Sequence, residues 1–178
     1  MQTETDHQFS SLDVCKTLVK QKLLSSDKVK DILAKEDTVK KKLERTTGRG
    51  ASAKKRSNNN SHIDIIDVIA SFKAPREDGV GGLVDEDAIF TALAAEWDIP
   101  FKKIDPLQLD LNLVTTTIPQ NFAANHMVLP VDIKDGTLVV ATPAPLNLVV
   151  MDDIRRVTNM KAEAVITPRS DVKRLINE

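Results

Sequence analysis

The sequence lacks features on which several classes of protein depend. It contains no tyrosine, one tryptophan and five phenylalanines among 178 residues, so its core must be aliphatic. A single cysteine, Cys15, allows no internal disulfide, which is typical of a reducing compartment. No apolar run approaches the roughly 18 residues of a membrane-spanning helix, and the polar start is not that of a secretory signal peptide. These absences favour a globular cytoplasmic protein.

Charge is unevenly distributed, although the net charge is only −1. Residues 1–61 hold 14 Lys and Arg against 8 Asp and Glu, whereas residues 62–178 hold 11 against 18. This asymmetry predicts two functional parts. We expect an N-terminal tail and helical hairpin over residues 1–45, a flexible basic linker over residues 46–61, and an α/β domain over residues 62–178.

The predicted linker contains no apolar residue larger than alanine, so it cannot bury enough surface to order itself. Its Lys54-Lys55-Arg56 cluster has the charge to contact nucleic acid or anionic lipid. No aromatic residue lies among these charges to stack on a base. A solvated basic loop is therefore the favoured interpretation, and no nucleic-acid partner is expected.

The strongest pattern in the sequence predicts a small sheet in the second half of the chain. Two β-rich runs, Met127–Ile133 and Leu138–Ala141, flank Asp135-Gly136, a dipeptide typical of tight hairpin turns. The second run is apolar on both faces and is expected inside the sheet. A helical period follows from Asn147, and Ala162–Thr167 returns to a strand pattern. The apolar side of that helix is predicted to carry Leu148, Met151, Ile154 and Val157.

This order of hairpin, crossover helix and strand makes the second and third strands parallel, with a right-handed connection. The fold class is therefore α+β or α/β, with a helical N-terminal lobe and a three-stranded sheet flanked by helices. Residues 101–117 are predicted to be mostly extended or turn, with Thr117 capping a helix that runs to His126. Thr167-Pro168 is predicted to begin the final helix.

Residues suited to catalysis are scattered. His7, His62 and His126 have no second ligand at metal spacing. Cys15 lies on the apolar face of a predicted helix without a histidine nearby, which indicates an inert thiol. The Gly79–Gly82 stretch follows no strand and precedes no Lys-Ser or Lys-Thr pair, so it is weak evidence for a phosphate loop. We predict no enzyme activity in this chain, no metal and no cofactor.

Several short motifs together resemble a known family. They are Ile99-Pro100-Phe101, Ile118-Pro119, Val128-Leu129-Pro130, Asp135–Ala141 and Pro145-Leu146-Asn147, in this order. The pattern resembles the N-terminal domain of type II secretion and type IV pilus assembly ATPases, over residues 83–178 closely and over residues 11–45 loosely. The sequence lacks the nucleotide loop of the ATPase half, so we expect either an excised domain or a shorter protein that carries the module.

The resemblance implies a non-catalytic cytoplasmic adaptor, peripheral to the inner membrane through its partner. Its partners would be the cytoplasmic domain of an inner-membrane secretion or pilus protein and the ATPase module of the parent protein, with only indirect membrane contact. As the docking face we predict an apolar set on the first helices: Leu12, Val19, Leu23 and Leu24. The alternative is that these side chains are simply buried within the chain.

Some members of the family bind cyclic di-GMP through two tandem motifs, so the resemblance also implies a dinucleotide sensor as the alternative function. In the first motif, an arginine meets the ligand and glycines allow it to approach the backbone. Here Asp13 stands in the arginine position, and Cys15 and Lys22 stand in the glycine positions. An aspartate there would repel phosphate, so docking is favoured over dinucleotide binding.

Overall fold

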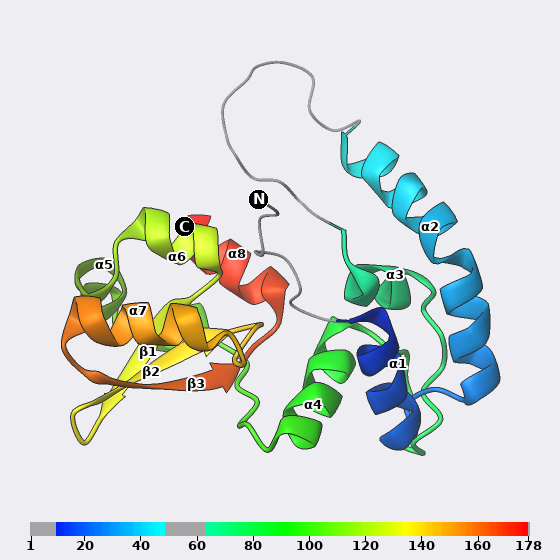
Figure 1. The fold of residues 1–178 in the computed structure, drawn as a ribbon, viewed down its shortest axis with the longest axis horizontal. Coiled ribbons are helices and arrows are strands. Elements are labelled where there is room, and N and C mark those ends of the chain that lie inside the picture. The colour runs from blue at the N-terminus through cyan, green and yellow to red at the C-terminus, as the bar shows by residue number, and fades with distance from the viewer. Residues whose placement is uncertain (1–9, 49–62, 178) are drawn as a thin grey trace. The chain divides into compact units, whose positions relative to one another are not determined.

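The computed structural model describes residues 10–48 and 63–177 of the chain. The elements are α1 Ser11–Lys20, α2 Ser26–Gly48, α3 Ile65–Ser71, α4 Glu86–Trp97, the short 3-10 helix η1 Pro106–Gln108, α5 Leu111–Thr117, α6 Gln120–His126, β1 Leu129–Lys134, β2 Thr137–Thr142, α7 Leu148–Thr158, β3 Lys161–Ile166 and α8 Arg169–Asn177 (Figure 1). Helices combined with one three-stranded sheet confirm the predicted α+β class.

The chain divides into two compact units, Met1–Ala92 and Leu93–Glu178, called unit 1 and unit 2 below. Unit 1 extends beyond the predicted helical hairpin because α3 packs against both α1 and α2. Helix α2 continues to Gly48, and the rest of the predicted linker, including the Lys54-Lys55-Arg56 cluster, lies outside the described residues.

The sheet of unit 2 has the predicted topology. Strand β2 lies in the middle, antiparallel to β1 and parallel to β3. Asp135 and Gly136 join β1 to β2 with φ angles of 48° and 75°, the two positive values that a tight hairpin turn needs and that this dipeptide favours. The β1–β2 register shifts between Pro130 and Asp132, which marks an irregularity at Val131.

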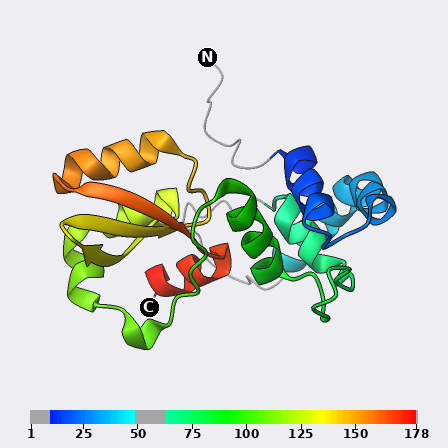
Figure 2. The same cartoon turned by 90° about the horizontal axis from the view of Figure 1, so that it is seen from below.

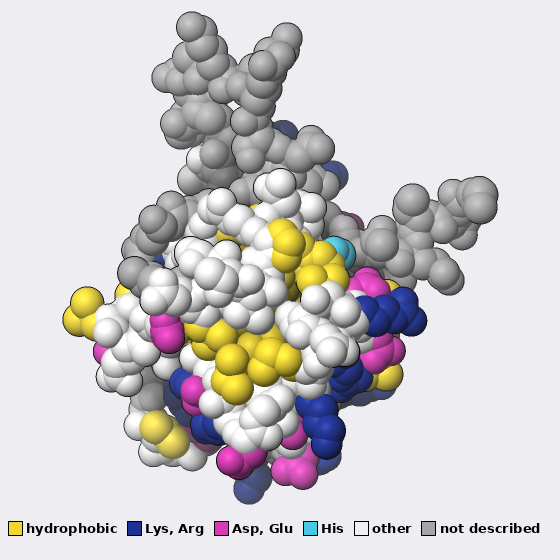
Figure 3. All heavy atoms as spheres, turned by 90° about the vertical axis from the view of Figure 1, so that its left-hand side faces the viewer, with side chains coloured by type: hydrophobic (Ala, Val, Ile, Leu, Met, Phe, Trp, Pro, Cys, Tyr) yellow, Lys and Arg dark blue, Asp and Glu magenta, His cyan; other side chains and the backbone are white. Residues whose placement is uncertain are grey.

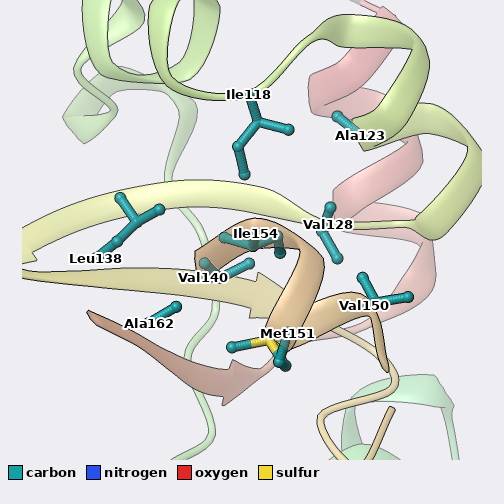
Figure 4. Close-up of a cluster of buried hydrophobic side chains, with 9 residues drawn as sticks. All are labelled: Ile118, Ala123, Val128, Leu138, Val140, Val150, Met151, Ile154 and Ala162. Carbon is teal, nitrogen blue, oxygen red and sulfur yellow. The ribbon is translucent and has the colours of Figure 1, made fainter. Parts of the chain in front are cut away.

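Two apolar clusters cover the two faces of this sheet. Figure 2 shows α7 on one side of the strands and α8 on the other. The first cluster lies beneath α7 and α6 and comprises Ile118, Ala123, Val128, Leu138, Val140, Val150, Met151, Ile154 and Ala162 (Figure 4). The second comprises Ile104, Leu129, Val131, Val139 and Ala141, with Val114 of α5 and Leu175 of α8 packed against it. Strand β2 therefore contributes to both faces, as its uniformly apolar sequence predicts.

The prediction for residues 101–117 was wrong in part. The Asp110 carboxylate accepts hydrogen bonds from the backbone N–H groups of Asn112 and Leu113 and begins α5, because a side-chain oxygen at this position satisfies otherwise unpaired donors. Thr117 is the last residue of α5 and does not cap α6. The residue before α6 is Pro119, whose ring offers no side-chain acceptor.

The apolar face predicted for α7 was also partly wrong. Met151 and Ile154 are buried, but Leu148 is 69% exposed and Val157 is 62% exposed. Steps of three residues advance about 300° around a helix, so nine residues turn the stripe through roughly half a circle. Leu148 and Val157 consequently lie on opposite sides of α7, and Val150 takes the inward position instead.

Candidate functional site

The candidate site is built on α1. This helix buries Val14, Cys15, Thr17 and Leu18. It ends in a tight turn in which the N–H of Gln21 donates to the Thr17 carbonyl over 2.8 Å and that of Lys22 donates to the Val19 carbonyl over 3.0 Å. Ser11 Oγ donates to the Glu36 carboxylate of α2 at 2.9 Å. The inward side of α1 is thus fixed within unit 1, and only its outward side is exposed to a binding partner.

The four residues predicted as a docking face are divided by the structure. Leu12 is 58% exposed and Val19 is half-buried, whereas Leu23 and Leu24 are buried. The Leu23 carbonyl also accepts a hydrogen bond from the Glu77 N–H at 3.1 Å. Only Leu12 and Val19 therefore present side-chain surface.

The outward side of α1 combines apolar and basic groups. Leu12, Lys16 and Val19 follow one another at steps of four and three residues, which places them in one line along the helix. Lys16 is exposed. Lys16 was not among the predicted residues because that prediction considered only apolar side chains. The same helical period places Lys16 between Leu12 and Val19. We call Leu12, Lys16 and Val19 the α1 surface.

Unit 1 contains a repeat that the sequence only hinted at. The buried set of α1 and the buried set of α3, which is Ile65, Ile66, Val68 and Ile69, match one for one at a spacing of 51 residues. Two residues after the end of each helix lies a lysine with positive φ, 57° at Lys22 and 46° at Lys73. In the sequence, α2 follows the first of these turns and α4 follows the second. Unit 1 thus repeats a short helix with the same buried positions and the same left-handed turn after it.

The side chains in this framework differ from those of the dinucleotide motif. Lys22 keeps the left-handed backbone that glycine adopts easily, but it adds a long side chain. Cys15 is 2% exposed, and burial, with a smaller contribution from the Glu36 carboxylate, raises the pKa of its thiol to about 11. Asp13 is exposed and contributes negative charge where a cation is expected. The first motif thus keeps the left-handed turn at Lys22, but Asp13 supplies a negative charge where a phosphate ligand needs a positive one.

The glycine-rich loop after α3 is organised around an internal ion pair. The Arg76 guanidinium donates to both oxygens of Asp78, and Asp78 also accepts from the Val80 N–H at 3.2 Å. The hydrogen bond from Arg76 holds the pKa of the Asp78 carboxyl below its usual value. The cation of this loop is therefore occupied by a neighbouring carboxylate and is not directed at a phosphate.

Within residues 10–48 and 63–177, no three His, Cys, Asp or Glu side chains approach closely enough to hold a metal ion. Of the three histidines, the structure describes His126, whose ring lies 4.4 Å from that of Phe122, centroid to centroid. No helix in the same residues is long and apolar enough to cross a membrane.

Comparisons with known proteins agree on one kind of domain. The MshEN domain model matches residues 97–178. The type IV pilus assembly ATPase PilB of Myxococcus xanthus (strain DK1622) is 22% identical over 95 residues, which are 53% of this chain and 17% of PilB. The chain therefore aligns with only about a sixth of this relative.

Two solved structures share the fold. The structure of MshE with cdg (cyclic di-GMP) has a TM-score of 0.59 and 17% identity, covering 92% of this chain and 96% of that one. The N-terminal domain of XpsE has a TM-score of 0.53 and 16% identity, covering 97% of each chain. Residues 97–178 match the MshEN domain model, and the chain shares the fold of the MshE structure and of the XpsE N-terminal domain.

Proposed function

We propose that the chain is a non-catalytic adaptor domain that docks a type II secretion or type IV pilus assembly ATPase onto an inner-membrane partner, on the cytoplasmic side. The observation that carries this proposal is the match to the XpsE N-terminal domain over 97% of both chains. The match extends over the helical elements as well as the sheet. The relatives found are N-terminal domains or whole ATPases, which supports a regulatory or docking role for this part.

The α1 surface is the part of unit 1 that we assign to docking. Burying an exposed leucine side chain stabilises a complex by about 1.5–3 kcal/mol before ordering costs, and Leu12 is largely exposed. The ammonium group of Lys16 favours acidic side chains around the apolar contact on the partner. In this proposal α1 binds the membrane partner and unit 2 carries the motor.

Replacing Leu12 with aspartate is expected to weaken binding of the partner by about tenfold or more, because the substitution removes apolar area and places a charge in the contact. The measurement is a calorimetric titration of the 178-residue chain with the cytoplasmic domain of the cognate inner-membrane protein. Leu146→Asp is the matched control, since Leu146 is 57% exposed and Leu12 is 58% exposed. Equal affinity of both variants, each folded by circular dichroism, would remove α1 from the interface.

A second candidate function is binding of cyclic di-GMP. The repeat of α1 and α3 and the positive φ angles of Lys22 and Lys73 favour it, as does the likeness in fold to MshE with its ligand. The side chains oppose it, since Asp13 would face phosphate with a negative charge. We expect calorimetry of the chain with cyclic di-GMP to give no binding heat at high micromolar protein. Saturable heat that is lost in a Lys22→Glu variant would instead establish the sensor function.

A further inference from the structure

Helix α2, the long helix of unit 1 in Figure 1, presents a cluster of cations to solvent in its second half. Lys41, Lys42 and Arg45 are exposed. Arg45 lies four residues after one lysine and three after the other, so the charged groups are neighbours on the helix. Among the described residues, none of these three side chains forms an ion pair. We call Lys41, Lys42 and Arg45 the α2 basic face.

The contacts of α2 direct this face away from α1. The Glu36 carboxylate accepts a hydrogen bond from Ser11 of α1 at 2.9 Å, and Lys40 pairs with Glu36 at 2.7 Å. Val39 and Leu43 are half-buried on the same side of the helix as this pair. Because successive residues advance about 100° around a helix, the α2 basic face lies on the opposite side from these contacts.

The helix dipole accounts for only part of this charge. Helix α2 ends at Gly48, and a cation gains from the dipole only within the last turn, which contains Arg45 but not Lys41 or Lys42. Like charges three or four residues apart destabilise a helix. The three cations therefore repel one another in the isolated chain, and an anionic surface against them would relieve this repulsion.

The charges of unit 2 are arranged differently. Figure 3 shows Lys and Arg side chains beside Asp and Glu on a face of this unit. Both arginines of α7 pair with the aspartate three residues before them, at 2.7 Å and 3.8 Å. Charges paired in this way largely cancel at a distance. Of these two helices, it is therefore α2 that attracts an anionic surface.

We propose that the α2 basic face binds the anionic headgroups of a lipid bilayer directly. Protein interfaces contain an apolar core, and none of the large apolar side chains that are exposed in the described residues belongs to α2. The face thus offers charge alone, which suits a continuous field of negative charge. Clusters of Lys and Arg are typical of segments that bind anionic lipid, and residues 38–61 hold eight of them against a single acid, Glu44.

Nucleic acid is the other polyanion that such a face could bind. Residues 38–61 contain no aromatic side chain to stack on a base, whereas lipid headgroups require only charge. The preference for lipid also rests on the proposed docking to an inner-membrane partner, which brings the chain to an anionic bilayer. There the α2 basic face adds a direct contact to the indirect one through the partner, and two weak contacts on one chain reinforce each other.

The test is co-sedimentation of the 178-residue chain with vesicles at about 0.1 M salt. One set is phosphatidylcholine alone, and the other is a two-to-one mixture of phosphatidylcholine and phosphatidylglycerol. The wild-type chain is expected to bind only the anionic vesicles and to be released as salt is raised. Lys41→Gln/Lys42→Gln is expected to lower the partition coefficient roughly twentyfold, because each cation near an anionic bilayer contributes about a factor of five.

The matched control is Lys28→Gln/Lys30→Gln, which removes the same charge from the same helix. Lys30 pairs with Asp27 at 3.6 Å and lies about 16 Å along α2 from Lys41, beyond the screening length of roughly 10 Å, so the partition coefficient should stay nearly unchanged. Glutamine and lysine have similar helix propensities, and circular dichroism verifies that both variants are folded.

Three outcomes would overturn the proposal. The first is a wild-type chain that does not bind the anionic vesicles, and the second is an equal loss of binding in the two double variants. The third is an oligonucleotide that displaces the chain from the vesicles and no longer binds Lys41→Gln/Lys42→Gln, which would assign the face to nucleic acid. Because the vesicles contain no partner protein, these outcomes are independent of the titration that tests the α1 surface.

Discussion

Shortening Ile154 to alanine is expected to lower the free energy of unfolding by about 2–5 kcal/mol. Ile154 is 1% exposed and lies between α7 and the sheet, within the cluster that also holds Val140 and Met151 (Figure 4). Truncation removes buried methyl groups and leaves a cavity that the packed strands cannot fill. Urea denaturation followed by circular dichroism gives the difference in stability.

Val157→Ala provides the control on the same helix. Val157 is 62% exposed, so its truncation should change stability by no more than about 0.5 kcal/mol. Together, Ile154→Ala and Val157→Ala test the orientation of α7. The sequence period predicted that both residues face the core, whereas in the structure only Ile154 does. A large loss of stability in Val157→Ala would contradict the orientation described here.

The Cys15 thiol is expected to destabilise the fold at alkaline pH. Burial raises its pKa from the ordinary value of 9.0 to about 11 in the folded chain. Between these two pH values the unfolded chain releases a proton that the folded chain retains, so the stability that the neutral thiol contributes is complete below pH 9 and is lost as the pH rises towards 11. The loss is on the order of 2–3 kcal/mol over this pH range.

Comparison of the wild-type chain with Cys15→Ala isolates this effect, because every other ionisable group is common to both. The free energy of unfolding should fall more steeply with pH in the wild-type chain between pH 9 and 11. A second measurement is alkylation at pH 8, which should be about a hundredfold slower in the native chain than in urea, since only the thiolate reacts. Equal pH slopes in the two proteins would show that the thiol is not held neutral by burial.

The central part of the fold could be predicted because its local signals agree. Asp135-Gly136 favours the positive φ angles of a tight turn, and a strand that is apolar on both faces must lie inside a sheet. The sheet order and the parallel pairing of β2 with β3 confirm both inferences. Each of these features depends on residues that are close together in the sequence. Such local features are the ones that a sequence pattern predicts best.

The features that could not be predicted depend on distant contacts or on competing caps. Leu23 was predicted in the docking face, with burial as the alternative; it is buried, and its carbonyl accepts a hydrogen bond from the N–H of Glu77, far along the chain. Helix α5 was missed because its threonines weaken the helical signal, whereas Asp110 begins the helix. The repeat of α1 and α3 was obscured because α1 and α3 keep the position of buried side chains but not their identity.

The edges of the small sheet have a consequence for how the chain behaves at high concentration. On one edge, β1 contains Pro130, which has no N–H to donate, next to the irregularity at Val131. On the other, the Ile166 N–H and carbonyl of β3 are bonded to Pro100 and Lys102. Both edges are thus interrupted within the described strands, at Pro130 in β1 and at Ile166 in β3, and such interruptions hinder the addition of a strand from another molecule. The chain is therefore expected to have little tendency to form sheet-mediated aggregates at high concentration.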